Sequence, residues 1–173
     1  MISRLSCAFF MTAALLAPRI AEAAPQILGN FQSWAAYTTD AGAAKVCYAL
    51  SRPTSMEPAR VRRDPTFFLI NDWPGRKAKA EPEIVPGYQY KDGSDVTVEI
   101  GADKFTFFTK NDGGAGGAWV ESQADEQRLV DAMKAAPEAV VTGTSRRGTV
   151  TRDTYSLAGF TDALEKAHQA CAM

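Results

Sequence analysis

Phe160-Thr-Asp-Ala-Leu-Glu-Lys-Ala-His-Gln-Ala-Cys171 is the segment from which we predict the rest of the fold, because its apolar residues repeat with a helical period. Apolar positions at i, i+3, i+4, i+7 and i+11 share one face of a helix. In this segment those positions are Phe160, Ala163, Leu164, Ala167 and Cys171. The sequence therefore predicts a helix over about residues 160–170, with Cys171 on its buried face.

The strand predicted over Lys45–Ser51 offers a surface for this helix. Large apolar residues alternate there with Cys47 and Ala49, so the cysteine and the small alanine share one face of the strand. Small side chains on that face leave room for a helix to pack. A core-facing cysteine on the helix can then meet a core-facing cysteine on the strand.

The N-terminal segment has the three parts of a Sec-type secretory signal peptide. Met1-Ile-Ser-Arg4 is positively charged, Leu5–Ala17 is apolar, and Ala21-Glu-Ala23 is a small-x-small cleavage site. The apolar run is shorter than the roughly 20 residues that span a bilayer. We therefore predict a signal peptide over residues 1–23 and no membrane segment after cleavage. A single domain over residues 24–173 would then fold outside the cytoplasm.

Two cysteines, Cys47 and Cys171, remain after this cleavage. In an oxidising compartment such a pair is typical of one disulfide, and closing so long a loop contributes about 2 to 4 kcal/mol to stability. The alternative is a thiol enzyme, because His168 lies three residues before Cys171 on the same side of the helix and would serve as its base. Mass measurement of the alkylated, non-reduced protein separates the two interpretations.

Alternation, turn residues and capping signals predict mostly antiparallel strands, with two helices late in the chain. Strands are expected at about residues 31–38, 45–51, 66–70, 96–100, 104–110, 118–121, 139–144 and 149–155, and a first helix at about 123–136 with Ser122 as its N-cap. Residues 71–92 are rich in proline and charge and are predicted to form a long surface loop. The glycine-rich residues 112–117 are predicted to connect two strands of a hairpin. The predicted fold class is α+β: a mainly antiparallel, sandwich-like or curved sheet with two helices near the C-terminus.

Charge and composition limit the kinds of partner and of chemistry. Without Arg4, Arg19 and Glu22 of the signal peptide, the 19 basic and 20 acidic residues become 17 and 19, a net charge of about −2. A nucleic-acid-binding domain normally carries a marked basic excess. One histidine excludes a multi-histidine metal site, and neither a nucleophile elbow nor a Cys-x-x-Cys motif is present. We therefore predict no metal, no cofactor, no nucleic acid and no catalytic residues.

Two basic clusters flank the strand predicted at residues 66–70. They are Arg60, Arg62 and Arg63 before it, and Arg76, Lys77 and Lys79 after it. Such clusters suit contact with phosphate groups, including those of lipopolysaccharide, or with an acidic partner; the alternative is an ordinary solvated, charge-balanced surface. Trp73 stands beside Pro74 at a predicted turn and is expected to be exposed. Together with the basic clusters it makes up the candidate binding residues.

The other tryptophans and the carboxylates do not define a site. Trp34 and Trp119 lie within predicted strands and are expected in the core. Asp64, Asp72 and Glu99 are scattered over different elements, so the sequence assigns no acid–base pair. A non-catalytic binding protein should show an exposed apolar or basic patch and no buried cluster of titratable groups.

The segment Tyr155-Ser-Leu-Ala-Gly-Phe-Thr-Asp-Ala-Leu164 resembles the closing signature of the invasion-associated locus B family, a strand followed by a Leu-x-Gly-Phe-x-x-Ala-Leu helix. Gly29-Asn-Phe-Gln-Ser-Trp34 is similar to the opening strand of that family, and the order of the central elements agrees, so the resemblance covers nearly the whole processed chain. Family members commonly carry a cysteine four residues after the tryptophan, where this chain has Thr38. They also carry a pair around the loop at residues 109–118, which has none here, so only Cys47 matches a family cysteine.

The resemblance implies an exported envelope protein of a Gram-negative bacterium, from a group of which some members are linked to host-cell invasion and virulence. We accordingly expect a periplasmic or secreted, non-catalytic binding protein. Its partner would be a protein or a component of the envelope or of a host surface. The alternatives are a small hydrolase or thiol enzyme that uses Cys171 and His168, and a structural envelope component that forms a stable homo-oligomer.

Overall fold

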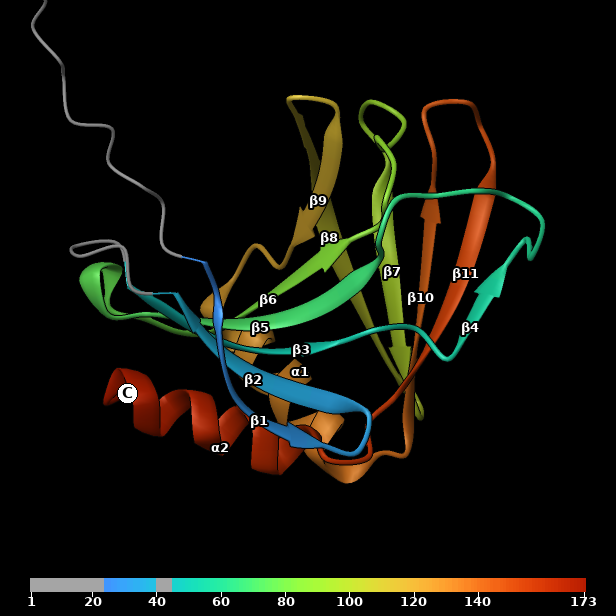
Figure 1. The fold of residues 1–173 in the computed structure, drawn as a ribbon. Helices are drawn as coiled ribbons and strands as arrows, with labels where there is room; N and C mark the ends of the chain where they lie inside the picture. The colour runs from blue at the N-terminus through green and yellow to red at the C-terminus, as the bar shows by residue number, and fades with distance from the viewer. Residues whose placement is uncertain (1–23, 40–44) are drawn as a thin grey trace, which may run out of the picture.

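The computed structural model describes residues 24–39 and 45–173, so the predicted signal peptide and residues 40–44 of the first predicted turn lie outside the described residues. Within this part of the chain, 11 strands form one antiparallel sheet, and two α-helices pack against it (Figure 1). The strands are β1 (Gln26–Phe31), β2 (Trp34–Thr39), β3 (Val46–Ser51), β4 (Ser55–Glu57), β5 (Phe67–Trp73), β6 (Ala78–Val85), β7 (Asp95–Ile100), β8 (Asp103–Asp112), β9 (Ala115–Trp119), β10 (Glu138–Thr144) and β11 (Val150–Ser156). The helices are α1 (Gln123–Ala135) and α2 (Phe160–Cys171), and a short 3-10 turn, η2, covers Pro74–Arg76.

The sheet has two groups of strands that meet at a narrow junction. Its order is β1-β2-β3-β5-β6-β9-β8-β7-β10-β11-β4, and β6 and β9 join with only two residue pairs in register, Glu83 with Trp119 and Ile84 with Ala118. Figure 1 shows β1–β3, β5 and β6 running across the molecule and β7–β11 standing upright beside them. The outermost strands, β1 and β4, do not pair, so the sheet stays open. The predicted mainly antiparallel sheet with two helices is confirmed.

Helix α2 packs against the first strands of the sheet, as its apolar period predicts. The five residues of the predicted face are all buried, and Figure 1 shows the helix beneath β1 and β2. Cys171 is bonded to Cys47 of β3, with the two Cα atoms 5.9 Å apart, so the predicted disulfide is present. Gly159 precedes the helix with φ of +86°, and a Cβ there would lie 1.9 Å from the carbonyl oxygen of Phe31. Only glycine therefore fits where the chain enters α2.

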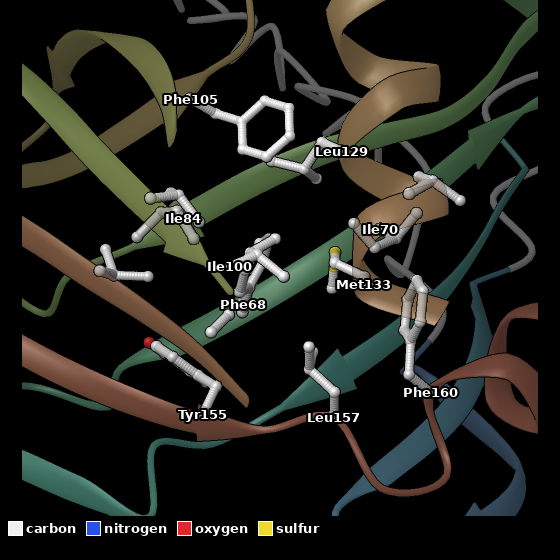
Figure 2. Packing of buried hydrophobic residues seen from close by; sticks show 14 of the residues in the cluster. Phe68, Ile70, Ile84, Ile100, Phe105, Leu129, Met133, Tyr155, Leu157 and Phe160 are labelled. Atoms are coloured by element: carbon white, nitrogen blue, oxygen red, sulfur yellow. The ribbon is translucent and has the colours of Figure 1, made fainter. Parts of the chain in front are cut away.

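One hydrophobic cluster connects the inner face of the sheet with both helices (Figure 2). At its centre Phe68 of β5 packs edge-on against Phe107 and Tyr155, with ring centroids 6.5 and 5.5 Å away. Helix α1 contributes Leu129, Val130 and Met133, and its first turn is capped as predicted, since the Ser122 hydroxyl accepts the Asp125 N–H at 3.1 Å.

No helix among the described residues combines the length and apolarity that crossing a membrane requires.

Strand β6 overturns the predicted long loop over residues 71–92. β5 continues to Trp73, η2 makes the turn, and β6 then occupies the middle of the sheet. Ala80, Pro82 and Ile84 are its buried positions. Pro82 lies just before Glu83 and Ile84, the two residues of β6 that pair with β9. At Pro82 itself β6 has no partner on the β9 side, so the missing N–H of the proline is tolerated.

The sequence patterns predict neither of the two edge strands, β1 and β4. β4 has only three residues, too few to reveal a period, and β1 is exposed at half of its positions without the alternation that marks a half-buried strand. Phe31, predicted to begin a strand, ends β1 instead. Trp34 opens β2 and is buried as predicted, and its indole N–H donates to the Ser156 carbonyl at 2.9 Å.

Candidate functional site

Three aromatic side chains lie partly exposed on the outer face of the sheet, around a concavity of about 420 Å³. Trp73 ends β5, Phe108 belongs to β8, and Trp119 ends β9. We name this concavity the aromatic groove; its lining residues are Trp73, Arg76, Glu81, Glu83, Phe108, Lys110, Trp119 and Val120. Its volume is within the range of about 300 to 1,000 Å³ that small-molecule sites occupy.

Strand alternation brings the rings of Phe108 and Trp119 to the outer face. Phe107 of β8 and Ala118 of β9 are fully buried in the core, so the residue that follows each of them faces outward. Phe108 and Trp119 are cross-strand partners, and their ring centroids lie 6.1 Å apart. The expectation that Trp119 packs in the core is therefore wrong.

Two cations lie over the aromatic rings at the border of the groove. The Arg76 guanidinium carbon is 4.5 Å from the Trp73 ring centre, and Arg76 also pairs with Glu81 at 2.9 Å. Lys110 Nζ is 5.3 Å from the Phe108 ring centre. The side chain of Arg76 remains 59% exposed. Such contacts orient the charged groups but leave their hydrogen-bonding atoms accessible to a ligand.

Glu83 and Trp73 carry the less exposed polar groups of the groove. Asn71 Nδ2 donates to the Glu83 carboxylate at 2.9 Å. Burial raises the pKa of Glu83 above its ordinary value, and the hydrogen bond from Asn71 opposes that rise. The indole nitrogen of Trp73 is buried and has no hydrogen-bond partner among the described residues. Trp73 is thus half-buried rather than fully exposed, and ring contacts hold its side chain.

A second concavity, of about 570 Å³, lies where four connecting segments meet. We name it the arginine pocket; its lining residues are Val61, Arg62, Arg63, Tyr88, Gln89, Gly114, Ser145, Arg146, Arg147, Thr149 and Thr151. Four of these are arginines, and none is an aspartate or a glutamate. Two arginines precede β5, and two lie in the turn between β10 and β11, so residues about 85 positions apart in the sequence contribute to one site.

Arg63 is the buried arginine of this pocket. Its two terminal nitrogens donate to the two oxygens of Asp153 at 2.8 and 2.5 Å, and the two side chains are only 2% and 4% exposed. The hydrogen bonds to Asp153 raise the pKa of the Arg63 guanidinium, so the guanidinium stays ionised. The guanidinium also lies 5.8 Å from the ring centre of Tyr88.

Tyrosines extend this ion pair into a buried cluster of titratable groups. The hydroxyls of Tyr88 and Thr151 are 2.7 Å apart. The hydroxyls of Tyr90 and Tyr155 are buried without a hydrogen-bond partner among the described residues. Burial raises the pKa of both phenols, which keeps them protonated. A buried cluster of titratable groups is therefore present, contrary to the expectation for a non-catalytic protein. Asp153 is its single carboxylate and the Arg63 guanidinium occupies both of its oxygens, so the cluster provides no pair of carboxylates for acid–base catalysis.

The structure divides the predicted binding residues between the two sites. Trp73 and Arg76 belong to the aromatic groove, and Arg62 and Arg63 to the arginine pocket. Arg60 and Lys77 are exposed and line neither site. The sequence prediction omits Phe108, Lys110, Glu81 and Glu83 of the groove and Arg146 and Arg147 of the pocket. Of these residues, only Arg146 and Arg147 are marked by a local pattern in the sequence, because they are adjacent arginines in a predicted hairpin turn.

The residues of the thiol-enzyme alternative, His168 and Cys171, lie on α2 and are already engaged. The Cys171 sulfur is bonded to Cys47, so Cys171 offers no free thiol as a nucleophile. His168 Nδ1 lies 2.5 Å from one oxygen of Asp72, whose other oxygen accepts the Ala80 N–H at 2.9 Å. Among the described residues, no group of three or more His, Cys, Asp or Glu side chains is arranged to hold a metal ion.

These features define a disulfide-bonded protein with an open, mainly antiparallel sheet, whose surface concavities include the aromatic groove and the arginine pocket. The family model described as invasion associated locus B (IalB) protein matches residues 34–168. The chain belongs to this family, which confirms the resemblance found in its closing segment. No curated protein and no solved structure matches the chain.

Proposed function

We propose that this chain is an exported, non-catalytic binding protein that recognises a carbohydrate of the envelope or of a host-cell surface. The single observation that carries this proposal is the aromatic groove, where three partly exposed rings lie beside two cations and two carboxylates. The N-terminal signal segment, the disulfide and the family support the exported setting.

The chemistry of the aromatic groove favours a hydroxyl-rich, uncharged ligand. Arg76 and Lys110 balance Glu81 and Glu83 in formal charge, so the groove attracts neither strong anions nor strong cations. The carboxylates accept hydrogen bonds and the cations donate them, which together satisfy hydroxyl groups. The rings add an apolar surface with a fixed geometry. A saccharide has both parts, an apolar face of C–H groups and a rim of hydroxyls.

Tryptophan fluorescence tests this proposal directly, because two of the three tryptophans line the groove and Trp34 is buried elsewhere. The processed protein is titrated with a panel of neutral di- to tetrasaccharides. We expect a saturable fluorescence change with at least one of them. Trp73→Ala and Trp119→Ala should each weaken that binding by about tenfold or more, as loss of a central aromatic contact does.

Phe67→Ala is the matched control for these variants. Phe67 is also a partly exposed ring of β5 with an arginine over it, since Arg52 lies 5.1 Å from its ring centre, but it is outside the groove. We expect this variant to bind like the wild type. Absence of binding to every saccharide, or equal weakening by Phe67→Ala, would refute the proposed ligand.

The exported setting has its own test. The full chain, expressed in a Gram-negative host, should be recovered from the periplasm or the medium with an N-terminus at Ala24 and with both remaining cysteines protected from alkylation before reduction. Recovery from the cytoplasm with residues 1–23 intact would contradict export without bearing on the groove.

A further inference from the structure

We infer that the arginine pocket binds a phosphate monoester carried on a larger organic group, at a site separate from the aromatic groove. Four arginines converge there, without any acidic lining residue, in a concavity of about 570 Å³.

The charge of the arginine pocket is not neutralised from within the described part of the chain. Arg63 is paired with Asp153, and Arg146 is 3.5 Å from Asp92, which is 82% exposed and therefore a weak partner. Arg62 and Arg147 form no ion pair with any described residue. Like charges that converge from distant segments oppose the compact state, and a bound anion removes that cost.

The side-chain chemistry favours phosphate over a diffuse negative surface. Every cation in the lining is an arginine and none is a lysine. Arginine presents paired N–H donors that match two oxygens of a phosphate group, whereas lysine acts as a point charge. Hydroxyls from Ser145, Thr149 and Thr151 also line the pocket and add uncharged hydrogen-bonding groups.

The segments that carry the arginines are fixed to the sheet before any ligand binds. The bidentate pair of Arg63 with Asp153 anchors the segment before β5 to β11. Asp64 N–H donates to the Gly87 carbonyl at 3.1 Å, and Arg146 N–H donates to the Gln89 carbonyl at 2.8 Å. Prior ordering of this kind lowers the entropy that binding would otherwise cost.

The size and walls of the pocket indicate an organic carrier for the phosphate. The volume is that of a small-molecule site and is far larger than a single oxyanion needs. Val61, which is 43% exposed, and the ring of Tyr88 provide apolar walls beside the arginines. A sugar phosphate and a phosphorylated lipid headgroup share this combination of a monoester and an organic body.

Calorimetric titration of the processed protein with glucose 6-phosphate is the first arm of the test, and co-sedimentation with phosphatidylcholine vesicles that contain phosphatidic acid is the second. Arg62→Ala/Arg147→Ala should weaken binding by at least about tenfold, because charge-assisted hydrogen bonds are lost. Arg62→Lys/Arg147→Lys keeps the charge and should still weaken binding several-fold. Arg128→Ala removes an arginine of α1 that is also exposed but lies outside the pocket, and this variant should bind like the wild type.

The two arms separate the sources of the phosphate. Binding of glucose 6-phosphate supports a soluble ligand, and binding of the vesicles alone supports a lipid headgroup, provided that the double alanine variant abolishes it. Failure of both probes to bind would overturn the inference. Equal weakening by Arg128→Ala, or full affinity of the double lysine variant, would also overturn it, since either result would show only a general attraction of charge.

Discussion

Thr38 lies beside the disulfide and accounts for the pairing of Cys47. It is the cross-strand partner of Cys47, and its hydroxyl lies 3.5 Å from the Cys47 sulfur. This is the position at which the resemblance to family members places a cysteine. In this chain the neighbouring strand offers no thiol, and Cys47 is instead bonded to α2.

The replacement Thr38→Cys in a Cys171→Ala background should therefore restore a local disulfide between residues 38 and 47. Thr38 and Cys47 occupy opposed positions on the core face of β2 and β3, within reach of a disulfide. Peptide mapping of the alkylated, non-reduced protein measures the bond. Thr39→Cys in the same background is the control, because residue 39 faces the other side of the sheet and should leave both thiols free.

Glu83 should make stability depend on pH. Its folded-state pKa is raised by burial, so its contribution to stability is present below the unfolded pKa and is lost as the pH rises through the folded pKa. Glu83→Gln removes this dependence. Relative to the variant, the wild type should lose a small amount of stability as the pH rises from the ordinary range of a glutamate pKa to neutral, small because the carboxylate keeps part of its hydration. Urea unfolding at both pH values measures it, and a pH-independent difference would contradict it.

At the residue level, local signals in the sequence name Trp73 and Arg76 as binding residues, and that role stays a prediction. Trp73 and Arg76 are three positions apart around a Pro-Gly turn, and the structure stacks them. The sequence alone does not fix the direction of Trp119, because a five-residue, glycine-containing strand offers too few side chains to set the phase of its alternation. Its outward direction depends on Phe108 of the paired strand, which only the register of β8 and β9 reveals.

At the scale of the element, a buried ion pair holds a segment that has no regular secondary structure of its own. Residues 58–66 connect β4 to β5. Among them, Arg63 has a buried side chain that pairs with Asp153 of β11. Asp153→Asn would leave a buried, unpaired guanidinium, and should lower the free energy of unfolding by about 3 to 5 kcal/mol. Denaturant unfolding measures the loss.

Arg152→Ala is the comparison for this prediction. Arg152 precedes Asp153 in β11 and pairs with Glu99 at 3.4 Å, but both side chains are about half exposed. Loss of such a pair should cost about 1 kcal/mol or less. A similar loss of stability in both variants would show that burial does not determine the contribution of the Arg63 pair.

Element-level prediction failed chiefly at β6. Pro82, Pro86 and alternating charges are typical of a surface loop, and no local rule distinguishes them from a strand. The strand forms because Ala80, Pro82 and Ile84 share a face that the core covers, and because β9 pairs with β6 only beyond the proline. By contrast, α2 and the hairpins β7–β8 and β10–β11 were predictable, since their periods or their turns lie within one short segment.

At the scale of the whole molecule, each half of the chain contributes one element that pairs with or packs against the other group of strands. β4 comes from the first part of the chain but pairs with β11 at the far edge of the second group. α2 follows β11 but packs against β2 and β3 of the first group. The narrow β6–β9 junction is therefore only one of several connections between the groups.

This exchange of elements predicts one cooperative unfolding transition for residues 24–173. Far-UV circular dichroism, which reports the sheet, and the fluorescence of buried Trp34 in a Trp73→Phe/Trp119→Phe background should give coincident thermal curves. Two separated transitions would show that the strand groups unfold independently, and would contradict a single domain.

The bond between Cys47 and Cys171 turns most of the polypeptide into a covalent ring. A peptidase that cuts once at an exposed turn inside this ring, such as Gly113-Gly114, opens the backbone but releases no fragment. The nicked molecule keeps its mass apart from one added water, and its pieces separate only after a reductant is supplied. In a compartment rich in proteases, recognition surfaces carried by either piece would thus outlast the first cleavage.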